Sequence, residues 1–215
     1  MGRILVRHAW RELIRTARRM STEGLVVGTS GNVSARVGDR LLITPTGVPY
    51  DELGDDDLVA VDLRGRQTDG TLRPTSELPM HLAVYGSTPA RAVVHTHAVH
   101  ATAVSTLVPE LPAVHYATAA LGGAVRVAPY ALYGTEELAA GMLRALAGRS
   151  ACLLQNHGTV AYGDDLAQAY DRTAQLEWMC RVWLAARSVP GLSPSLLSAG
   201  QLEEAAERLK GYGQP

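Results

Sequence analysis

Three of the seven histidines of the chain lie in residues 93–100, VVHTHAVH. The two valines that open this stretch predict a β-strand, which would follow a turn at Pro89. Side chains two positions apart share one face of a strand, so His95 and His97 can offer two imidazole nitrogens to one metal ion. His100 has the wrong parity for that face. Because a zinc-type site needs three or four ligands, the other ligands must come from elsewhere in the chain.

Two further positions are candidates for the same site. His157 stands between Asn156 and Gly158, at a bend that interrupts two apolar runs, and this placement suggests a side chain aimed into a site. Glu77 follows Ser76 at the expected start of a helix. Each residue alone also has an ordinary structural explanation. Many histidines simply fill space in the core or cap a helix, and a glutamate in the first turn of a helix interacts favourably with the helix dipole. Spacing by itself does not show that these residues converge.

Three turns rich in small residues, GTSGNVS, TPTGVP and RPTSE, could bind an anion. They combine backbone N–H groups with hydroxyls, which are the groups that form phosphate-binding nests and helix N-termini. The same compositions are also typical of plain turns.

The elements that would position these residues alternate irregularly. Short apolar runs predict a hairpin around Gly38-Asp39, a strand and turn within residues 58–70, a strand at 124–130 and a bent pair of runs at 150–163. Helical spacing and capping residues predict helices at 4–23, 77–86, 98–106, 135–148, 165–187 and 200–213, with Ser76 capping the second and Thr135 the fourth. No sustained βαβ rhythm is present, so we expect one α+β domain over residues 1–215.

Composition narrows the class of protein. The chain is 47% hydrophobic and 19% charged, which is ordinary for a globular protein. A net charge of −1 argues against nucleic acid as a partner, since no basic excess is available to neutralise phosphates. Cys152 and Cys180 form no CxxC pair, which favours a reducing cytoplasmic compartment without disulfides. The N-terminal segment resembles neither a signal peptide nor a membrane span, so we expect no membrane partner.

Seven sequence blocks, taken in order, resemble the zinc-dependent class II aldolase/adducin family, and in particular its L-fuculose 1-phosphate aldolases. The resemblance runs over about residues 9–212. The blocks are GTSGNVSARV, LLITPTGVPYDEL, PTSELPMHLAVY, AVVHTHAVHATAV, LPAVHYATAALGG, VAPYALYGTEELA and LLQNHGTVAYG.

The resemblance implies a fold, an assembly and a metal centre. The fold would be α+β, with three α/β/α layers around a largely antiparallel sheet, assembled as a homotetramer with sites between subunits. One Zn²⁺ per subunit would be held by His95, His97 and His157, with Glu77 close to the metal as the catalytic acid/base.

The resemblance also implies the residues that meet the substrate, a small phosphorylated sugar. Tyr116 would reach in from the neighbouring subunit, and Tyr212 would be a mobile C-terminal catalytic tyrosine. The phosphate-binding residues would be Gly31, Asn32, Thr46, Gly47, Thr75 and Ser76. The implied reaction is metal-dependent retro-aldol cleavage of a (deoxy)ketose 1-phosphate, such as L-fuculose 1-phosphate, to dihydroxyacetone phosphate and an aldehyde through a zinc-bound enediolate.

Departures from the fuculose pattern leave the sugar open. Ser30, Tyr133 and Leu209 differ from the family near the aldehyde end, and the chain contains no phenylalanine. Thr75 stands for a serine, and Asn156 stands for a second histidine. A 5-deoxyribulose or methylthioribulose 1-phosphate aldolase is therefore a close alternative.

Other members of the family fit less well. A ribulose 5-phosphate 4-epimerase would carry aspartate at position 77, so Glu77 favours an aldolase. A methylthioribulose phosphate dehydratase also remains open. A non-enzymatic adducin-like module would have lost its metal ligands, which here are all present.

Overall fold

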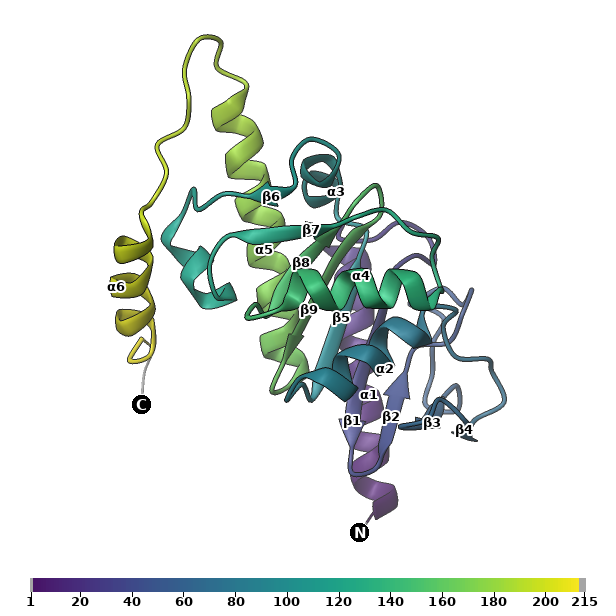
Figure 1. Ribbon diagram of the computed structural model, residues 1–215. Coiled ribbons are helices and arrows are strands. Elements are labelled where there is room, and N and C mark those ends of the chain that lie inside the picture. Colours follow the sequence, from purple (N-terminus) through teal and green to yellow (C-terminus); the bar gives the residue numbers. More distant parts are fainter. Residues whose placement is uncertain (1, 213–215) are drawn as a thin grey trace.

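A nine-stranded mixed sheet organises the chain (Figure 1). The computed structural model describes residues 2–212. The strands are β1 (Asn32–Val37), β2 (Arg40–Ile43), β3 (Ala60–Asp62), β4 (Gln67–Asp69), β5 (Ala92–Thr96), β6 (Glu110–Leu111), β7 (Val125–Ala128), β8 (Ala151–Leu154) and β9 (Gly158–Gly163). Their order across the sheet is β4-β3-β2-β1-β5-β9-β8-β7-β6, so β5 lies at the centre.

Helices cover both faces of this sheet. They are α1 (Gly2–Thr22), α2 (Leu78–Ser87), α3 (Val99–Ser105), the 3₁₀ helix η1 (Tyr116–Leu121), α4 (Glu136–Leu146), α5 (Leu166–Arg187) and α6 (Ala199–Leu209). In Figure 1, α2 and α4 lie in front of the sheet, while α1 and α5 lie behind it.

One parallel pair makes the sheet mixed rather than purely antiparallel. β7 and β8 run parallel, and the other adjacent strands run antiparallel. Parallel neighbours need a crossover between them, and α4 supplies it. The sequence shows no sustained βαβ rhythm because this single unit does not repeat.

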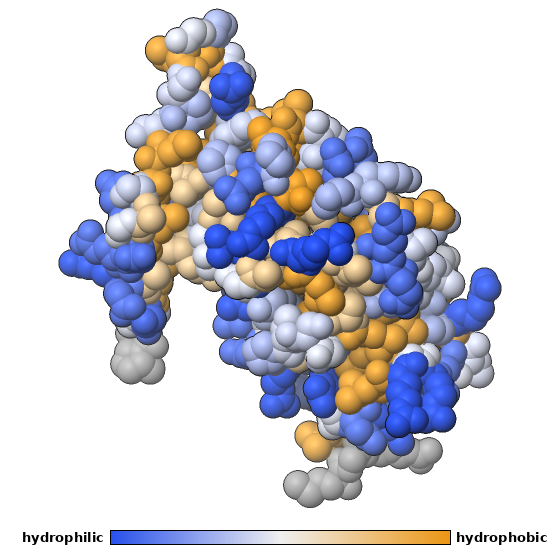
Figure 2. All heavy atoms as spheres, viewed as in Figure 1, coloured by the Kyte–Doolittle hydropathy of each residue, from blue (hydrophilic) through white to orange (hydrophobic). Residues whose placement is uncertain are grey.

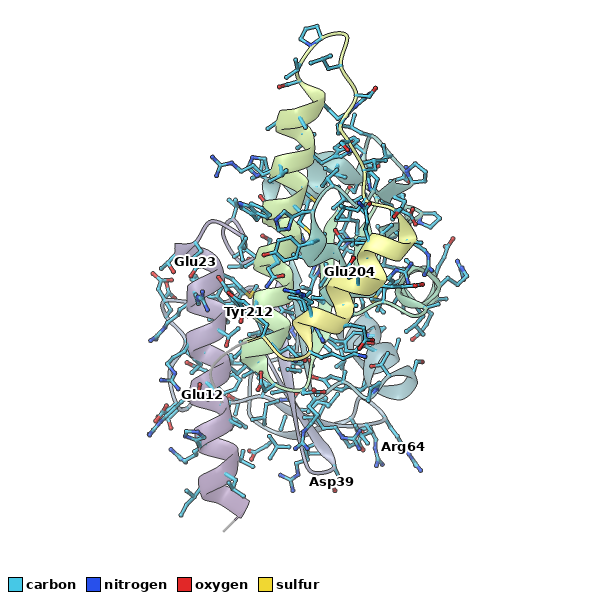
Figure 3. All side chains as sticks on the ribbon, turned by 90° about the vertical axis from the view of Figure 1, so that its left-hand side faces the viewer. Glu12, Glu23, Asp39, Arg64, Glu204 and Tyr212 are labelled. Carbon is cyan, nitrogen blue, oxygen red and sulfur yellow. The ribbon has the colours of Figure 1, made fainter. Side chains whose placement is uncertain are left out.

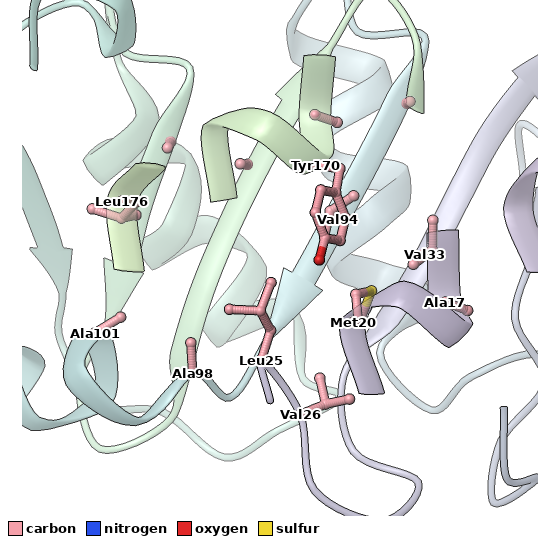
Figure 4. Packing of buried hydrophobic residues seen from close by; sticks show 14 of the residues in the cluster. Ala17, Met20, Leu25, Val26, Val33, Val94, Ala98, Ala101, Tyr170 and Leu176 are labelled. Carbon is pink, nitrogen blue, oxygen red and sulfur yellow. The ribbon is translucent and has the colours of Figure 1, made fainter. Parts of the chain in front are cut away.

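The core lies on both sides of the sheet because strand side chains alternate. Val94 packs with the cluster beneath α1 and α5, whereas its neighbour Val93 packs with the cluster beneath α2 and α4. Figure 4 shows part of the first cluster, where Val94 lies near Tyr170 and Met20. The alternation fixes which way each side chain of β5 points, and His95 shares the α2 side with Val93.

Most of the expected local elements are confirmed. β1 and β2 form the hairpin around Gly38-Asp39, Thr135 accepts a hydrogen bond from the backbone of Leu138 as the cap of α4, and β8 and β9 are antiparallel across the Asn156 bend. The cap expected at Ser76 is wrong. Glu77 occupies the N-cap position of α2 and makes no side-chain capping bond.

The C-terminal helix lies apart from the sheet. A segment without helix or strand, residues 188–198, leads from α5 to α6, which packs on η1 at the side of the molecule (Figures 1 and 3). Figure 3 shows Tyr212 just beyond the end of α6. Apolar residues also reach the surface in several patches of the face drawn in Figure 2. Over residues 2–212, no helix combines the length and apolarity needed to cross a bilayer.

Candidate active site

The order of the central strands brings the candidate residues to one edge of the sheet. β5 pairs antiparallel with β1 on one side and with β9 on the other, so the end of β5 meets the starts of both neighbours. Asn32, the first residue of β1, is directly opposite His95. His157 immediately precedes β9, and His97 immediately follows β5.

Three imidazoles converge at this edge. The ring centroids of His95, His97 and His157 are 4.8–4.9 Å apart, and the rings meet edge to face. The Nε2 atoms of His95 and His97 lie 3.0 Å apart. The two rings therefore converge as the parity argument requires, although β5 ends at Thr96 and His97 is one residue beyond it.

Glu77 completes the group from the opposite side. Its Oε2 lies 2.9 Å from Nε2 of His95, and its Oε1 lies 3.3 Å from Nε2 of His157. The side chain is buried, and among residues 2–212 its Oε1 has no hydrogen-bond partner. An unpartnered buried carboxylate oxygen is costly, so it marks a place where a cation or a proton belongs.

Hydrogen bonding selects the lone pairs that face the group. His95 Nδ1 lies 2.8 Å from the carbonyl oxygen of Thr159, which can only accept, so Nδ1 carries the hydrogen. In the neutral ring Nε2 then presents its lone pair towards His97 and Glu77. A backbone carbonyl that orients a ligating histidine in this way is a common arrangement around metals.

The electrostatics of the group are strongly coupled. Burial, together with the charge of His95, lowers the pKa of His97 to about 3 and the pKa of His157 to about 4. Burial opposes the charged form of His95, but the carboxylate of Glu77 outweighs it and raises the His95 pKa. Burial likewise opposes ionisation of Glu77, yet the charges of His95 and His157 bring its pKa below the usual range. His97 and His157 are therefore neutral at neutral pH, as metal ligands must be.

This donor set fits a metal ion. One ligand atom from each of Glu77, His95, His97 and His157 lies within 4.8 Å of the others. Imidazole nitrogen and carboxylate oxygen are ligands that zinc prefers, and three imidazoles leave its charge undiminished. The unpartnered Oε1 of Glu77 and the Nε2 lone pair of His95 are the observations that favour an ion here.

Gly158 permits the close approach of the two histidine-bearing strands. A Cβ at this position would lie 2.0 Å from the carbonyl oxygen of Thr96. Only glycine therefore allows β9 to start beside the end of β5, where His97 and His157 face each other.

A cavity of about 380 Å³ opens in front of the group. Glu77, His97 and His157 line it, whereas His95 is fully buried behind them. All six residues expected at a phosphate also line this cavity: Gly31, Asn32, Thr46, Gly47, Thr75 and Ser76. The structure thus brings the metal-type group and the small-residue turns to a single cavity.

The turns offer neutral donors. Gly31 and Gly47 have φ values of 72° and 71°, a left-handed conformation that suits anion-binding loops. A Cβ at Gly31 would also lie 2.8 Å from the carbonyl oxygen of His95, so the turn packs directly on the histidine strand. Among the described residues lining the cavity there is no lysine or arginine. An anion here would be held by N–H groups, hydroxyls and any bound cation.

Two hydroxyls at the start of α2 are placed for such a ligand. Thr75 Oγ1 accepts from Asn32 Nδ2 at 3.1 Å and from the backbone of Glu77 at 3.3 Å, which leaves its own hydrogen for another acceptor. Ser76 does not cap α2, so its hydroxyl is also free of that bond.

Tyr116 and Tyr212 lie elsewhere in the chain. Their exposed fractions are 54% and 87%, and neither lines the cavity beside Glu77. Both line a second cavity between η1 and α6, together with Leu209. Within one chain the structure therefore separates these tyrosines from the metal-type group, and their expected roles remain predictions.

Several residues near the site were missed or left open by the sequence. Tyr130 lines the cavity with Ser30 and Tyr133, and two tyrosines in one Pro- and Gly-bounded loop were a signal that could have indicated it. Tyr50 was also missed, and its hydroxyl donates to the carbonyl oxygen of Gly31 at 2.5 Å.

His100, in contrast, lies outside the group of ligand atoms. Its Nδ1 lies 2.6 Å from Oε1 of Glu177. That oxygen also accepts from the backbone N–H of His100, and Oε2 of Glu177 accepts from the backbone N–H of Ala101.

Comparison with known proteins places this geometry in context. The family described as Class II Aldolase and Adducin N-terminal domain matches residues 11–184. L-fuculose phosphate aldolase of Escherichia coli (strain K12) is 42% identical over 205 residues, which cover 94% of each chain. The 5-methylthioribulose-1-phosphate/5-deoxyribulose-1-phosphate aldolase of Rhodospirillum rubrum is 39% identical over 214 residues, covering 99% of this chain and 94% of the relative. A solved structure of L-fuculose 1-phosphate aldolase superimposes with a TM-score of 0.90 at 34% identity, covering 94% of this chain and 96% of that one.

Proposed function

The chain belongs to the class II aldolase and adducin family, and on this premise we propose that it is an aldolase, a carbon–carbon lyase. It would cleave a ketose 1-phosphate to dihydroxyacetone phosphate and an aldehyde, with L-fuculose 1-phosphate as the leading substrate. One observation carries the proposal: a partly buried Glu/His₃ group and a set of neutral anion-type turns line or back a single cavity. A sugar phosphate needs both, one at its carbonyl end and one at its phosphate.

His95, His97, His157 and Glu77 would hold one Zn²⁺ per subunit. When bound, the ion acts as a Lewis acid towards negative charge that develops on substrate oxygens. The support for it is the chemistry of the donor set and the unpartnered Oε1 of Glu77. His95 is buried behind the cavity, so water does not compete for its ring nitrogen. The exclusion of water strengthens the electrostatic interactions of His95.

The phosphate would bind at the turns that line the same cavity. Gly31 and Gly47 supply left-handed turns, and Thr75 supplies a hydroxyl hydrogen that has no acceptor among the described residues. This contact is remote from the bond that breaks, so its binding energy fixes the orientation of the substrate. The proposed phosphate residues are Gly31, Asn32, Thr46, Gly47, Thr75 and Ser76.

Cleavage moves two protons, and we assign each to a side chain. The C4 hydroxyl loses its proton as it becomes the aldehyde, and the phenol of Tyr116 from a neighbouring subunit would relay that proton to water. The electron pair of the C3–C4 bond passes to the dihydroxyacetone phosphate fragment, and C3 then takes a proton that Glu77, ionised at rest, would first have to take up from water. Glu77 is placed for this step because it lines the cavity with one oxygen unpartnered. General acid–base transfer of this kind contributes about 10²–10⁴-fold.

We propose that the active form is a homotetramer in the cytoplasm, each subunit being a single domain over residues 1–215. The exposure of Tyr116 and Tyr212, far from the cavity of their own chain, supports sites shared between subunits. Large apolar side chains at the surface, including Val99, Leu107 and Trp178, offer area for such contacts.

A second candidate substrate is 5-deoxyribulose or methylthioribulose 1-phosphate. Ser30 and Tyr133, which depart from the fuculose pattern, line the cavity where the aldehyde part would lie. A relative named for these sugars is 39% identical. Ribulose 5-phosphate 4-epimerase activity is less supported because position 77 is glutamate.

The proposal is tested by incubating zinc-loaded protein with a panel of ketose phosphates and measuring dihydroxyacetone phosphate by coupled reduction. Release from a ketose 1-phosphate supports the aldolase and ranks its aldehydes. Epimerised ribulose 5-phosphate without any release would replace the aldolase by the epimerase. No reaction with any substrate would favour an adducin-like module.

A further inference from the structure

A continuous chain of buried hydrogen bonds leads into the active site through His81. The hydroxyls of Tyr85 and Ser34 are 2.9 Å apart, and Ser34 Oγ lies 2.7 Å from His81 Nδ1. His81 Nε2 lies 2.5 Å from Asn32 Oδ1, and Asn32 Nδ2 lies 3.1 Å from Glu77 Oε2. All five side chains are buried, so water does not compete along the chain.

The donor and the acceptor of every bond follow from the carboxylate of Glu77 at the end of the chain of hydrogen bonds. An ionised carboxylate at Glu77 can only accept, so the NH₂ group of Asn32 faces it and Oδ1 faces His81. His81 must then carry its hydrogen on Nε2, and its Nδ1 accepts from Ser34. Because Ser34 has a single hydrogen, Tyr85 must donate to it. The four side chains thus all donate towards Glu77.

His81 serves this chain as a neutral ring. It is fully buried, and burial with the nearby His95 lowers its pKa to about 3. One neutral tautomer satisfies both of its partners, and the other tautomer would break the bond to Asn32.

Asn32 is the link on which Glu77 depends. One of its amide hydrogens goes to Glu77 Oε2 and the other to Thr75 Oγ1, each at 3.1 Å. An amide turned by 180° would present its oxygen to the carboxylate and lose these bonds, so the group that holds Oδ1 decides the orientation.

We propose that His81 is a positioning residue, which fixes the Asn32 amide so that Glu77 is held by Oε2 while its Oε1 stays unpartnered at the cavity. The inference rests on the acid/base role proposed for Glu77. A histidine that merely filled the core would pack equally well in either tautomer, and its replacement would leave Asn32 and Glu77 unmoved.

Two amide substitutions test whether His81 positions Asn32 or only fills space in the core. In His81→Gln the side-chain nitrogen reaches about as far as Nε2 and can still donate to Asn32. In His81→Asn the shorter amide reaches only as far as Nδ1, so it can meet Ser34 but not Asn32. Both variants bury one neutral amide at the same position, and they differ in size by one methylene.

The first arm of the test measures kcat for dihydroxyacetone phosphate release, with zinc content and the unfolding midpoint of each holoenzyme. We expect His81→Gln to stay within about threefold of wild type and His81→Asn to lose roughly tenfold or more in kcat, the scale of one lost charge-assisted hydrogen bond. Zinc content should be alike in the two variants, and the unfolding midpoint should show that both are folded at the assay temperature. Equal kcat values for the two variants would overturn the proposal.

The second arm does not depend on activity. Solvent exchange of the Asn32 side-chain amide hydrogens, followed by NMR on labelled holoenzyme, should be slow in wild type and His81→Gln and much faster in His81→Asn. Equal exchange in all three proteins would refute positioning by His81. If wild type releases no dihydroxyacetone phosphate, the proposed aldolase is wrong, but this exchange measurement still decides whether His81 fixes Asn32.

Discussion

The Nε2 atoms of His95 and His97 lie 3.0 Å apart, although the hydrogen bond from His95 Nδ1 to Thr159 turns the remaining lone pair of His95 towards His97. Two such nitrogens face each other favourably only when a proton or a cation lies with them. Glu77, 2.9 Å from His95, adds negative charge to the same place. The arrangement is therefore most stable with a positive group at its centre.

His95→Ala should abolish stoichiometric metal binding, because a three-imidazole site loses the ligand that is most buried. We expect metal affinity to fall by at least about a hundredfold, a loss at the upper end of that for an outer-shell partner. The measurement is metal content after dialysis against a weak chelator. His100→Ala is the matched control, since His100 bonds to Glu177 outside the group, and it should keep one ion per chain. Equal metal loss in both variants would contradict the assignment.

Glu77→Gln should keep the metal and lose turnover. The substitution retains the size of the side chain and leaves three imidazoles in place, but an amide is neither a useful general acid nor a general base at neutral pH. We expect kcat to fall by about 10²–10⁴-fold with one zinc still bound per chain. Steady-state kinetics and metal analysis on the same preparation check both halves. Wild-type turnover in this variant would remove Glu77 from the chemistry.

Gly158→Ala should damage the site through the backbone. Its Cβ would lie 2.0 Å from the carbonyl oxygen of Thr96, so β5 and β9 would have to separate beside His97 and His157. We expect the free energy of unfolding to fall by about 2 kcal/mol or more, measured by urea denaturation.

The control for this change is Gly86→Ala within α2. Nothing lies within 4 Å of a Cβ there, and alanine favours helix, so stability should stay the same or rise by up to about 1 kcal/mol. Equal stability changes at the two glycines would show that β9 has room to move.

Acid should destabilise the protein in part through His81. Burial, followed by the charge of His95, lowers its folded pKa to about 3, against 6.5 for the free side chain. Between these values the unfolded chain binds the extra proton, so the free energy of unfolding falls as pH falls from 6.5 towards 3. One such proton contributes at most about 1.4 kcal/mol per pH unit.

His81→Gln has no proton to take up, so its unfolding free energy should fall less steeply with acidification. Urea denaturation of metal-free wild type and variant at several pH values between 4 and 7 compares the two slopes. Identical slopes would show that His81 titrates normally in the folded protein.

Tyr116 should act on the cavity of another subunit. Tyr116→Phe is expected to lower kcat because the C4 hydroxyl loses the group that takes its proton. Glu77→Gln is expected to lower kcat because C3 loses its proton donor. If the two residues meet between subunits, denatured and co-refolded mixtures contain some sites in which both are wild type. Activity of the mixture above the mean of the two separate variants is the expected result. An activity of the mixture equal to the mean of the two separate variants would show that Tyr116 and Glu77 of one subunit serve the same active site.

The sequence could predict much of the site because its signals are local. Alternation along a strand predicted that His95 and His97 point together, and their Nε2 atoms do meet. The Asn156 bend does place His157 beside them, and Asn156 takes a positive φ of 56° there. These features depend on residues that are close in sequence, so one amino-acid sequence is enough to predict them.

Other features depend on contacts distant in sequence and could not be predicted. Asn32 meets His81 and Glu77 across gaps of 49 and 45 residues, so no local pattern marks the chain of hydrogen bonds. The parallel pairing of β7 with β8 depends on where α4 packs. Serine is a residue type that often caps helices, so the sequence predicted Ser76 as the N-cap of α2. The start of α2 lies at the cavity, and Glu77 takes the N-cap position instead.

The most direct test of the account compares dihydroxyacetone phosphate release with bound zinc in one wild-type preparation, before chelation, after chelation and after zinc is restored. We predict that release from a ketose 1-phosphate and zinc content fall together and return together, at one zinc per chain. A full rate of release from protein stripped of metal would contradict the central claim that the Glu77, His95, His97 and His157 group works as a metal centre.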